Sequence, residues 1–364
     1  MGRTTGSGER RTTHRTHRWR RALLATVITG AVVVPLSGAA RAEIPAPAPA
    51  ALAPLSVATL DETYEANRAN AAEASRMAAA HGNRDRAAAD RAMADPSRRF
   101  LAFDGRGLGL ATEVFGDLAH ADRIAVLVPG SDTSIDTYDR FRDTARALHD
   151  RLTREAPQGT RTAVVAWLGY ETPGTVSTTV ATMGRADDAA PKLREFIRQL
   201  RALTIDERTG ATRAAGEAGA SGEAGEAGAR RASGAGEGRP RISLLCHSYG
   251  SVVCARAVSD LDVDDIALVG SPGTGVDTAA GLGTRARVWA ARGTDDWVGE
   301  VPHVRLDLLG TTVGFGTDPI SPSFGARVFA AGDGGHSDYF RPGSTSLANL
   351  ACIVLGETSE VTHG

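Results

Sequence analysis

The sequence lacks the common cofactor motifs. It contains no H-E-x-x-H pattern, no pair of C-x-x-C motifs, no P-loop and no G-x-G-x-x-G that opens a dinucleotide-binding unit. These absences leave no indication of a cofactor or a metal, and we expect neither.

The net charge is small, and lysine is rare. The formal net charge of -2 at pH 7 gives no general attraction to nucleic acid or to an anionic membrane surface. We therefore expect no nucleic-acid partner. Lys192 is the one lysine, and we attach no functional meaning to the excess of arginine. The 42% of hydrophobic residues can build a substantial core, so the chain as a whole is not disordered.

Residues 1–42 have the pattern of an export signal. Arg20 and Arg21 precede the apolar run ALLATVITGAVVVPL, and the small-residue site A-R-A follows, which predicts cleavage after Ala42. The run is shorter than the roughly 20 residues that span a bilayer and contains Pro35, so we expect no membrane span after cleavage. The arginine pair leaves twin-arginine export open beside Sec export. We expect a secreted or cell-envelope protein.

The remaining chain divides by composition. A Pro/Ala-rich linker (43–58) precedes a helical extension (59–95), with alanine-rich helices expected at 60–80 and 84–94. A larger domain covers 96–356, and a short tail covers 357–364. Within the domain, residues 207–240 are rich in Gly, Ala and Glu with almost nothing to bury, which predicts a disordered insertion.

Short apolar runs alternate with helical patterns from Arg98 onward. This alternation predicts an α/β fold with a mostly parallel central sheet flanked by helices, and the first two runs look like an antiparallel start. Helices are expected at 133–152 and 190–203, each with one apolar stripe. The expected strands are RRFLAFD, LATEVFG, RIAVLVPG, TAVVAWLGY, RISLLCHS, DIALVGSPG, RVWAARG and RVFAAGD.

One of these strands leads directly into a candidate nucleophile. The run ISLLC continues into His247-Ser248-Tyr249-Gly250 and then into the helical stretch SVVCARAVS. This strand-turn-helix context is the one that a nucleophile elbow needs, with Ser248 exposed on a strained turn. Cys246 stands where glycine is usual, and a thiol still fits there. The alternative is a plain turn in which Ser248 caps the helix.

Two of the three cysteines flank Ser248. Cys246 ends the strand and Cys254 lies about a turn and a half into the following helix, so a disulfide between them is geometrically conceivable. Two small buried thiols are the alternative, and the sequence does not decide between the two. Cys352 lies on an apolar C-terminal helix and is expected in the core.

An acid and a histidine follow Ser248 in the order that a Ser-acid-His triad requires. His336 lies in the loop after the strand RVFAAGD, between glycines and Ser-Asp-Tyr. Asp295 and Asp296 end the strand RVWAARG, and the spacing favours Asp296, with Asp295 as the alternate and Asp277 as a third candidate. We interpret Ser248, Asp296 and His336 as nucleophile, orienting acid and general base.

An oxyanion hole is expected next to the nucleophile. Its donors would be the backbone N–H of Tyr249, at the helix N-terminus, and that of Ser131, in the loop after RIAVLVPG.

Seven segments together resemble a bacterial family of α/β-hydrolase domains of unknown function. They are VLVPGSDTSIDTYDRF, VAWLGYETP, LLCHSYGSVVC, LVGSPGTGVD, ARGTDDWV, FGARVFAAGDGGHSDYF and PGSTSLANLA. The resemblance runs from about residue 60 to 355 and spares the insertion. It implies the α/β-hydrolase fold and hydrolase chemistry on Ser248, Asp296 and His336, but it supplies no substrate.

The leading hypothesis is an esterase or lipase-like serine hydrolase acting on a small-molecule or lipid acyl substrate. Two alternatives stay open: acyl transfer on the same triad, and a non-catalytic envelope or binding protein on this scaffold. We expect the segments 171–188 and 297–325 to wall the pocket, with Trp297, Phe315 and Leu308 or Leu309 as apolar residues. The sequence leaves the oligomeric state open.

Overall fold

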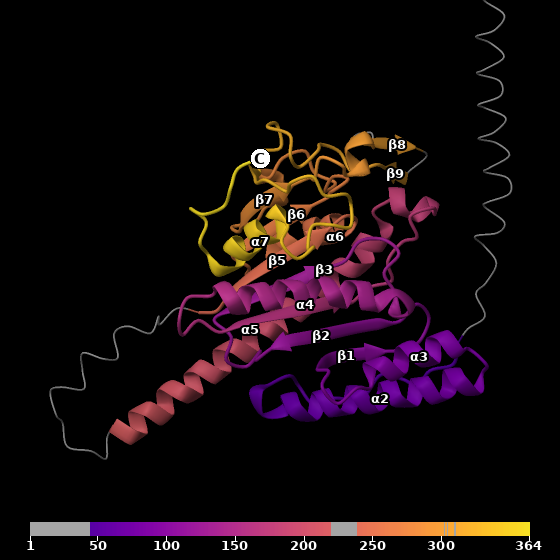
Figure 1. Ribbon diagram of the computed structural model, residues 1–364, viewed down its shortest axis with the longest axis vertical. Coiled ribbons are helices and arrows are strands. Elements are labelled where there is room, and N and C mark those ends of the chain that lie inside the picture. Colours follow the sequence, from indigo (N-terminus) through magenta and orange to yellow (C-terminus); the bar gives the residue numbers. More distant parts are fainter. Residues whose placement is uncertain (1–43, 220–238, 302, 304, 309–310) are drawn as a thin grey trace, which may run out of the picture. The chain divides into compact units, whose positions relative to one another are not determined.

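A computed structural model describes residues 44–219, 239–301, 303, 305–308 and 311–364 (Figure 1). The predicted signal segment, 1–42, lies outside the described residues, as does the 220–238 part of the predicted insertion. In the described part of the chain, none of the helices combines the length and hydrophobicity that a bilayer crossing needs.

An eight-stranded sheet organises the domain, with the strand order β1-β2-β4-β3-β5-β6-β7-β10. β2 is antiparallel to both β1 and β4, and the other pairs are parallel, so the predicted mostly parallel sheet with an antiparallel start is confirmed. The strands are β1 Phe100–Asp104, β2 Leu110–Gly116, β3 Arg123–Val128, β4 Thr162–Leu168, β5 Arg241–His247, β6 Asp265–Val269, β7 Arg287–Ala291 and β10 Arg327–Val328.

Helices cover both faces of this sheet. α4 (Tyr138–Glu155) and α7 (Thr345–Leu355) pack on one face, and α5 (Gly184–Gly219) and α6 (Gly250–Ala257) pack on the other. Neighbouring strand residues therefore enter different cores: Leu127 packs with α4 and α7, whereas Val128 packs with α5 and α6. This two-sided burial explains the nearly continuous apolar strand sequences.

The helical extension consists of α2 (Leu60–Ala80) and α3 (Arg84–Met93), close to the predicted bounds. The Asn83 side chain accepts a hydrogen bond from the Arg86 N–H and so caps α3. Buried alanines of α2 pack against Phe100 and Phe103 of β1. The extension therefore shares a core with the first edge of the sheet, and Figure 1 shows α2 and α3 beside β1.

Two predicted boundaries were wrong. The helix expected at 190–203 begins at Gly184 and continues to Gly219, so residues 207–219 are helical and not part of a disordered insertion. These residues include several of Ala, Glu and Arg, which favour helix even where there is little to bury. The helix expected from Thr133 begins as a 3-10 turn, η2 (Ile135–Thr137), before α4.

A short hairpin was not predicted. β8 (Leu306–Leu308) pairs antiparallel with β9 (Thr311–Val313) inside the segment expected to wall the pocket. The remaining 3-10 turns are η1 Val57–Thr59, η3 Thr178–Ala181, η4 Val258–Asp260, η5 Ala280–Leu282 and η6 Trp297–Glu300.

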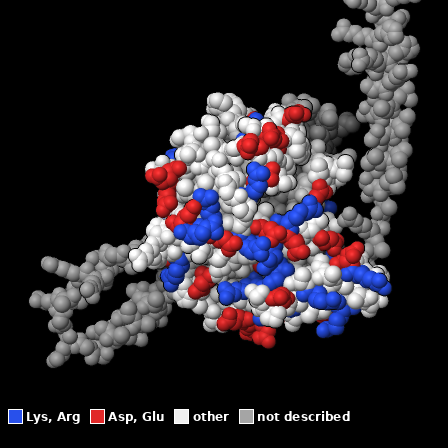
Figure 2. Space-filling model, viewed as in Figure 1, with Lys and Arg blue, Asp and Glu red and all other residues white. Residues whose placement is uncertain are grey.

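Acidic and basic side chains are interspersed on the face shown in Figure 2. Along α4, for example, Arg146 pairs with Asp143 and Arg151 with Glu155. Such pairs leave little excess charge of either sign along this helix. The absence of a nucleic-acid partner stays a prediction.

A buried arginine ties the helical extension to the rest of the domain. The Arg86 guanidinium donates to both carboxylate oxygens of Asp136 in η2, at 2.6 and 3.1 Å. It also donates to the carbonyls of Gly105 and Gly107 in the turn between β1 and β2. α3, this turn and the loop before α4 are thus held together by one side chain.

Asp90 lies beside this arginine and is buried, and its Oδ1 has no hydrogen-bond partner among the described residues. Burial raises the pKa of Asp90 to about 7, an effect that the charge of Arg86 reduces and that of Asp136 increases. Between about pH 4 and pH 7 the unfolded chain ionises this carboxyl while the folded protein keeps it protonated. Folding stability should therefore fall as the pH rises through this window.

We predict that Asp90→Asn is more stable than the wild type at pH 8 and has lost most of this advantage at pH 4, because the amide does not titrate. Urea denaturation at a series of pH values measures the difference. Asp85→Asn, at an exposed position of the same helix, is the control. An advantage of Asp90→Asn that is the same at both pH values contradicts the prediction.

Candidate active site

Ser248 occupies a sharp turn between β5 and α6. Its φ of 54° lies in the left-handed region, which a residue with a side chain rarely adopts, and this agrees with the strained elbow expected from the sequence. A Cβ on Gly250 would lie 2.5 Å from the Val128 carbonyl oxygen, and one on Gly130 would lie 2.5 Å from the Ser248 Cβ. Only glycine at these two positions lets the end of β3 pass so close to the turn.

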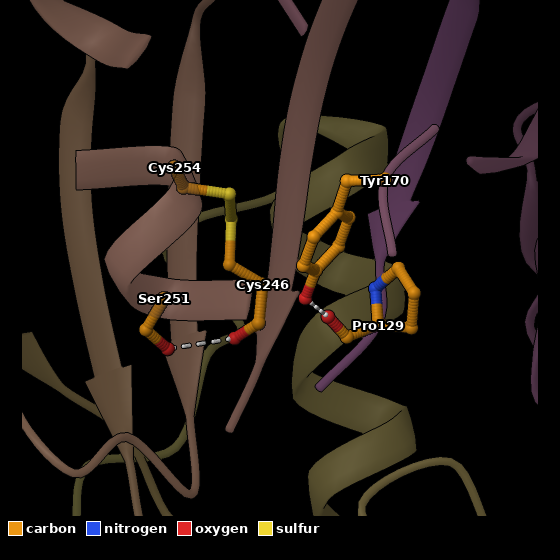
Figure 3. The surroundings of a disulfide bond; sticks show 5 residues. All are labelled: Pro129, Tyr170, Cys246, Ser251 and Cys254. Atoms are coloured by element: carbon orange, nitrogen blue, oxygen red, sulfur yellow. Dashed lines mark hydrogen bonds between the residues drawn. A yellow bond between two sulfur atoms is a disulfide. The ribbon is translucent and has the colours of Figure 1, made fainter. Parts of the chain in front are cut away.

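A disulfide bond joins the two sides of this turn (Figure 3). It links Cys246, near the end of β5, to Cys254 in α6. The disulfide that the sequence left open is therefore present. Both cysteines are fully buried. The Ser251 hydroxyl donates to the Cys246 carbonyl, which adds a second link between strand and helix. Cys352 of α7 is unbonded and partly buried.

The structure brings Ser248, His336 and Asp296 into one hydrogen-bonded chain. His336 Nε2 lies 2.9 Å from Ser248 Oγ, and His336 Nδ1 lies 2.9 Å from Asp296 Oδ1. Asp295 is exposed and makes no contact with this histidine among the described hydrogen bonds. Asp277 is exposed and lies 3.5 Å from Arg305. Of the three candidate acids, Asp296 is the one that can orient His336.

Asp296 is a buried carboxylate surrounded by donors. Besides the His336 ring it accepts from the Val298 N–H at 2.9 Å and from the Tyr339 hydroxyl, and its side chain is 0% exposed. Burial raises the pKa of Asp296, but the hydrogen bonds from His336, Tyr339 and Val298 outweigh burial and hold it below its usual range. The carboxylate is therefore ionised at neutral pH.

Sequence reasoning did not identify Tyr339. Its hydroxyl donates to Asp296 Oδ2 and accepts from the Gly293 N–H. Burial raises the pKa of this hydroxyl well above its usual value, and the hydrogen bond to Asp296 raises it further. The available signal was its place three residues after His336. That spacing alone gives no indication that the ring turns back onto Asp296.

Two aromatic rings pack against His336. His247 lies with its ring centroid 4.8 Å from that of His336, and its Nε2 donates to the His336 carbonyl at 2.7 Å. Burial, followed by the nearby His336, lowers the pKa of His247 to about 4, so His247 is neutral and adds no charge to the site. The Trp297 ring centroid also lies 4.8 Å from that of His336, and Trp297 is 50% exposed.

The two predicted oxyanion donors lie at the same cavity as Ser248. Ser131 and Tyr249 both line it, and no described hydrogen bond uses either of their backbone N–H groups as donor. Tyr249 directly precedes α6, so its N–H belongs to the free N-terminal end of that helix. The geometry is compatible with two donors, and their role in an oxyanion hole stays a prediction.

Hydrogen bonds hold the loop that carries Ser131. The Asp132 N–H donates to the Pro173 carbonyl, and the Asp132 carboxylate accepts from the Thr175 N–H and hydroxyl. The Thr133 N–H donates to the Thr172 hydroxyl. Asp132 has a left-handed φ of 57°, so this loop is a second place where backbone strain is stabilised by its neighbours.

A cavity of about 970 Å³ opens at Ser248 and His336. Trp297 and Phe315 line it as expected, and so do Val180 and Ala181 from the 171–188 segment. The side chain of Leu308 is not described, and Leu309 lies outside the described residues. Among the residues that the structure describes, no three His, Cys, Asp or Glu side chains form a group that could hold a metal ion.

Comparisons with known proteins place these residues in a family. A family model described as "Alpha/beta hydrolase" matches residues 104–215 and 210–306, more than half of the chain, which includes Ser248 and Asp296 but not His336. Uncharacterized proteins from two strains of Mycobacterium tuberculosis, CDC 1551 / Oshkosh and ATCC 25618 / H37Rv, are 28% identical over 284 residues. The match covers 70% of this chain but 38% of the length of these relatives.

Solved structures similar to this chain include a predicted CIB-like hydrolase from Thermoplasma acidophilum, at 14% identity and a TM-score of 0.39, covering 72% of this chain and 96% of that one. An α/β serine hydrolase without a lid from Xanthomonas campestris has 13% identity and a TM-score of 0.38, covering 73% and 95%.

We predict that replacing both Cys246 and Cys254 by alanine lowers the free energy of unfolding by about 2–3 kcal/mol, because the unfolded chain regains the entropy of a ring that closes over a separation of 8 residues. Urea denaturation measures the loss. Cys352→Ala, which breaks no disulfide, is the matched control and should cost less. An unchanged unfolding free energy in the double variant would show that the bond does not stabilise the fold.

Proposed function

The chain belongs to the α/β-hydrolase family, and from this premise we propose that it is a serine hydrolase that cleaves a carboxylic ester or a related acyl bond. The observation that carries the proposal is the hydrogen-bonded chain from Ser248 Oγ through His336 to Asp296, at the wall of an open cavity. A helix-capping serine would need neither partner.

In the proposed reaction, His336 Nε2 takes the proton of Ser248 as Oγ attacks the acyl carbon. The ionised Asp296 holds the imidazole with Nδ1–H toward itself and stabilises the imidazolium that forms. The N–H groups of Ser131 and Tyr249 donate to the oxyanion. His336 then protonates the leaving group, and water, activated by the same histidine, releases the acyl group from Ser248.

The apolar cavity supports an acyl substrate in preference to a highly charged one. Phe141, Val180, Phe315 and Phe340 contribute to its walls, and the charged lining residues Asp132, Arg140 and Asp143 are exposed. Burying apolar groups of the substrate against such walls is favourable, whereas a charge placed there would lose its hydration.

We also propose that the protein is exported and works outside the cytoplasm. The Cys246–Cys254 disulfide supports this proposal, because the cytosol of most organisms keeps protein thiols reduced. The Arg-rich segment with its apolar run and A-R-A site supplies the signal that such export needs.

A fluorophosphonate probe tests the nucleophile. We predict that it labels the wild-type protein and does not label Ser248→Ala, because the probe reacts with a serine activated by a base. Hydrolysis of p-nitrophenyl butyrate by Ser248→Ala should fall by on the order of 10⁴-fold or more. Ser337→Ala, a serine lining the same cavity, is the matched control and should keep its labelling. A folded Ser248→Ala protein that still reacts like the wild type would contradict the proposal.

We predict that Tyr339→Phe lowers kcat by about tenfold with little change in KM, because Asp296 loses one of its donors and orients His336 less well. Steady-state kinetics on the same ester measures both constants. Tyr64→Phe, in the buried face of α2, removes a hydroxyl far from the triad and serves as control. A Tyr339→Phe enzyme with the wild-type kcat would show that this hydroxyl does not support catalysis.

A further inference from the structure

The segment that follows β4, residues 170–175, binds the loop that follows β3. The Thr133 N–H donates to the Thr172 hydroxyl at 3.1 Å, and this hydroxyl donates to the Thr133 carbonyl at 2.8 Å. Asp132 makes further bonds to the same segment. β3 and β4 are parallel neighbours, so the residues that follow them meet at one edge of the sheet. These bonds fix the loop on the C-terminal side of Ser131.

The Tyr170 side chain fixes the loop on the other side of Ser131. Its hydroxyl donates to the Pro129 carbonyl at 2.6 Å (Figure 3). Gly130 alone separates Pro129 from Ser131, so this carbonyl belongs to the peptide plane next to the one that carries the Ser131 N–H. The bond therefore restricts the direction of the predicted oxyanion donor.

Gly130 makes such a restriction necessary. A side chain at this position would collide with Ser248, so the close approach of the two segments requires glycine. Glycine, however, leaves the backbone on either side of it free to rotate. Pro129 has no N–H, and its carbonyl is the backbone group through which a hydrogen bond can hold it. Tyr170 supplies that bond.

The Tyr170 ring is itself held firmly. It is 2% exposed and stacks on Trp167 with centroids 6.1 Å apart, and Trp167 stacks in turn on Phe196 of α5 at 6.5 Å. Burial, followed by the nearby Tyr249, raises the pKa of the Tyr170 hydroxyl well above its usual value. The hydroxyl therefore keeps its proton, and with it the bond to Pro129, in alkaline solution as well.

We propose that Tyr170 is a positioning residue for the oxyanion hole: its hydroxyl holds the Pro129 carbonyl and thereby aims the Ser131 N–H at the acyl oxygen before the reaction begins. This inference rests on the proposed hydrolase function and adds a residue to its mechanism. Ser131 lines the cavity and Tyr170 does not, so Tyr170 acts through the loop and not by touching the substrate. A donor that is fixed beforehand stabilises the developing charge without reorganising during the reaction.

The first test is Tyr170→Phe, which removes one oxygen atom and keeps the ring between its neighbours. On p-nitrophenyl butyrate we expect kcat to fall by about tenfold, less than the roughly hundredfold or more that follows the loss of an oxyanion donor, because the N–H remains but is less well aimed. KM should change by less than about twofold, since the ground-state ester carries no anionic oxygen. Steady-state kinetics on the purified full-length protein measures both constants.

Two ketones separate the oxyanion from the other contacts of the substrate. When an alkyl trifluoromethyl ketone adds to an activated serine, a bond forms between Ser248 Oγ and the carbonyl carbon and the C=O π bond breaks. The serine proton passes to His336, and the former carbonyl oxygen becomes anionic. The methyl ketone with the same alkyl chain binds as a neutral ketone. We expect Tyr170→Phe to weaken inhibition by the trifluoromethyl ketone by about tenfold and to leave inhibition by the methyl ketone unchanged.

Ser75→Ala is the matched control for the loss of a buried hydrogen bond. The Ser75 hydroxyl donates to the Ala87 carbonyl at 2.7 Å between α2 and α3, and neither residue lines the cavity. This variant should lose a comparable part of its stability in urea and keep the wild-type kcat and ketone affinities. A second variant carries p-aminophenylalanine at position 170. It retains an N–H donor on the same ring and should recover most of the kcat that phenylalanine loses.

The outcomes separate the inference from the function on which it rests. If the wild type cleaves the ester but Tyr170→Phe keeps its kcat, or weakens both ketones equally, the positioning role is wrong and the hydrolase function stands. The same conclusion follows if p-aminophenylalanine is as impaired as phenylalanine. If the wild type neither cleaves the ester nor reacts with the fluorophosphonate, the proposed function fails and the inference fails with it.

Discussion

The left-handed backbone at Ser248 is the constraint on which the arrangement of the site depends. Strain of this kind costs about 1–3 kcal/mol and persists only where the surroundings leave the chain no alternative. Here the surroundings are the glycines at 130 and 250, the bond from the Ser248 N–H to the Val269 carbonyl, and the disulfide between strand and helix. The turn exposes Oγ to the cavity and leaves the Tyr249 N–H at the start of α6. The proposed nucleophile and the predicted oxyanion donor thus follow from one local conformation.

The rest of the proposed triad depends on the parallel order of the strands. β5, β7 and β10 run in the same direction, so the residues that follow them meet at one edge of the sheet. Ser248 follows β5, Asp296 follows β7 and His336 comes after β10. The buried Asp296 needs compensation for its lost hydration, and Tyr339 and the Val298 N–H provide hydrogen bonds in addition to that of His336. The hydrogen bonds at Asp296 therefore both keep its carboxylate ionised and fix the orientation of the histidine.

Much of this could be predicted because it depends on local pattern and chain order. The strands were apparent from their continuous apolar runs, and the bounds of α2 from its acidic first turn and the glycine after its end. Spacing favoured Asp296 over Asp295 but left Asp295 as an alternate, because adjacent residues differ only in the direction that a short turn gives them. The disulfide required the actual distance between β5 and α6. Tyr339 was missed because its hydroxyl reaches Asp296 only after the loop that follows His336 has folded back.

The helical extension has a bearing on the site that its position in the sequence does not suggest. The family model begins at residue 104, so α2 and α3 lie outside the part of the chain that it matches. Even so, Arg86 of α3 holds Asp136, which is five residues after Ser131 and part of the same connection between β3 and α4. That connection is also fixed by the bonds of Asp132 to Pro173 and Thr175. An N–H that donates to a developing oxyanion is effective only when its position is fixed beforehand, because reorganising the donor during the reaction would use up the stabilisation. The buried Arg86 and its bonds to Gly105 and Gly107 hold Asp136 in place, so the extension supports the connection that carries Ser131, the predicted oxyanion donor, from outside the matched domain.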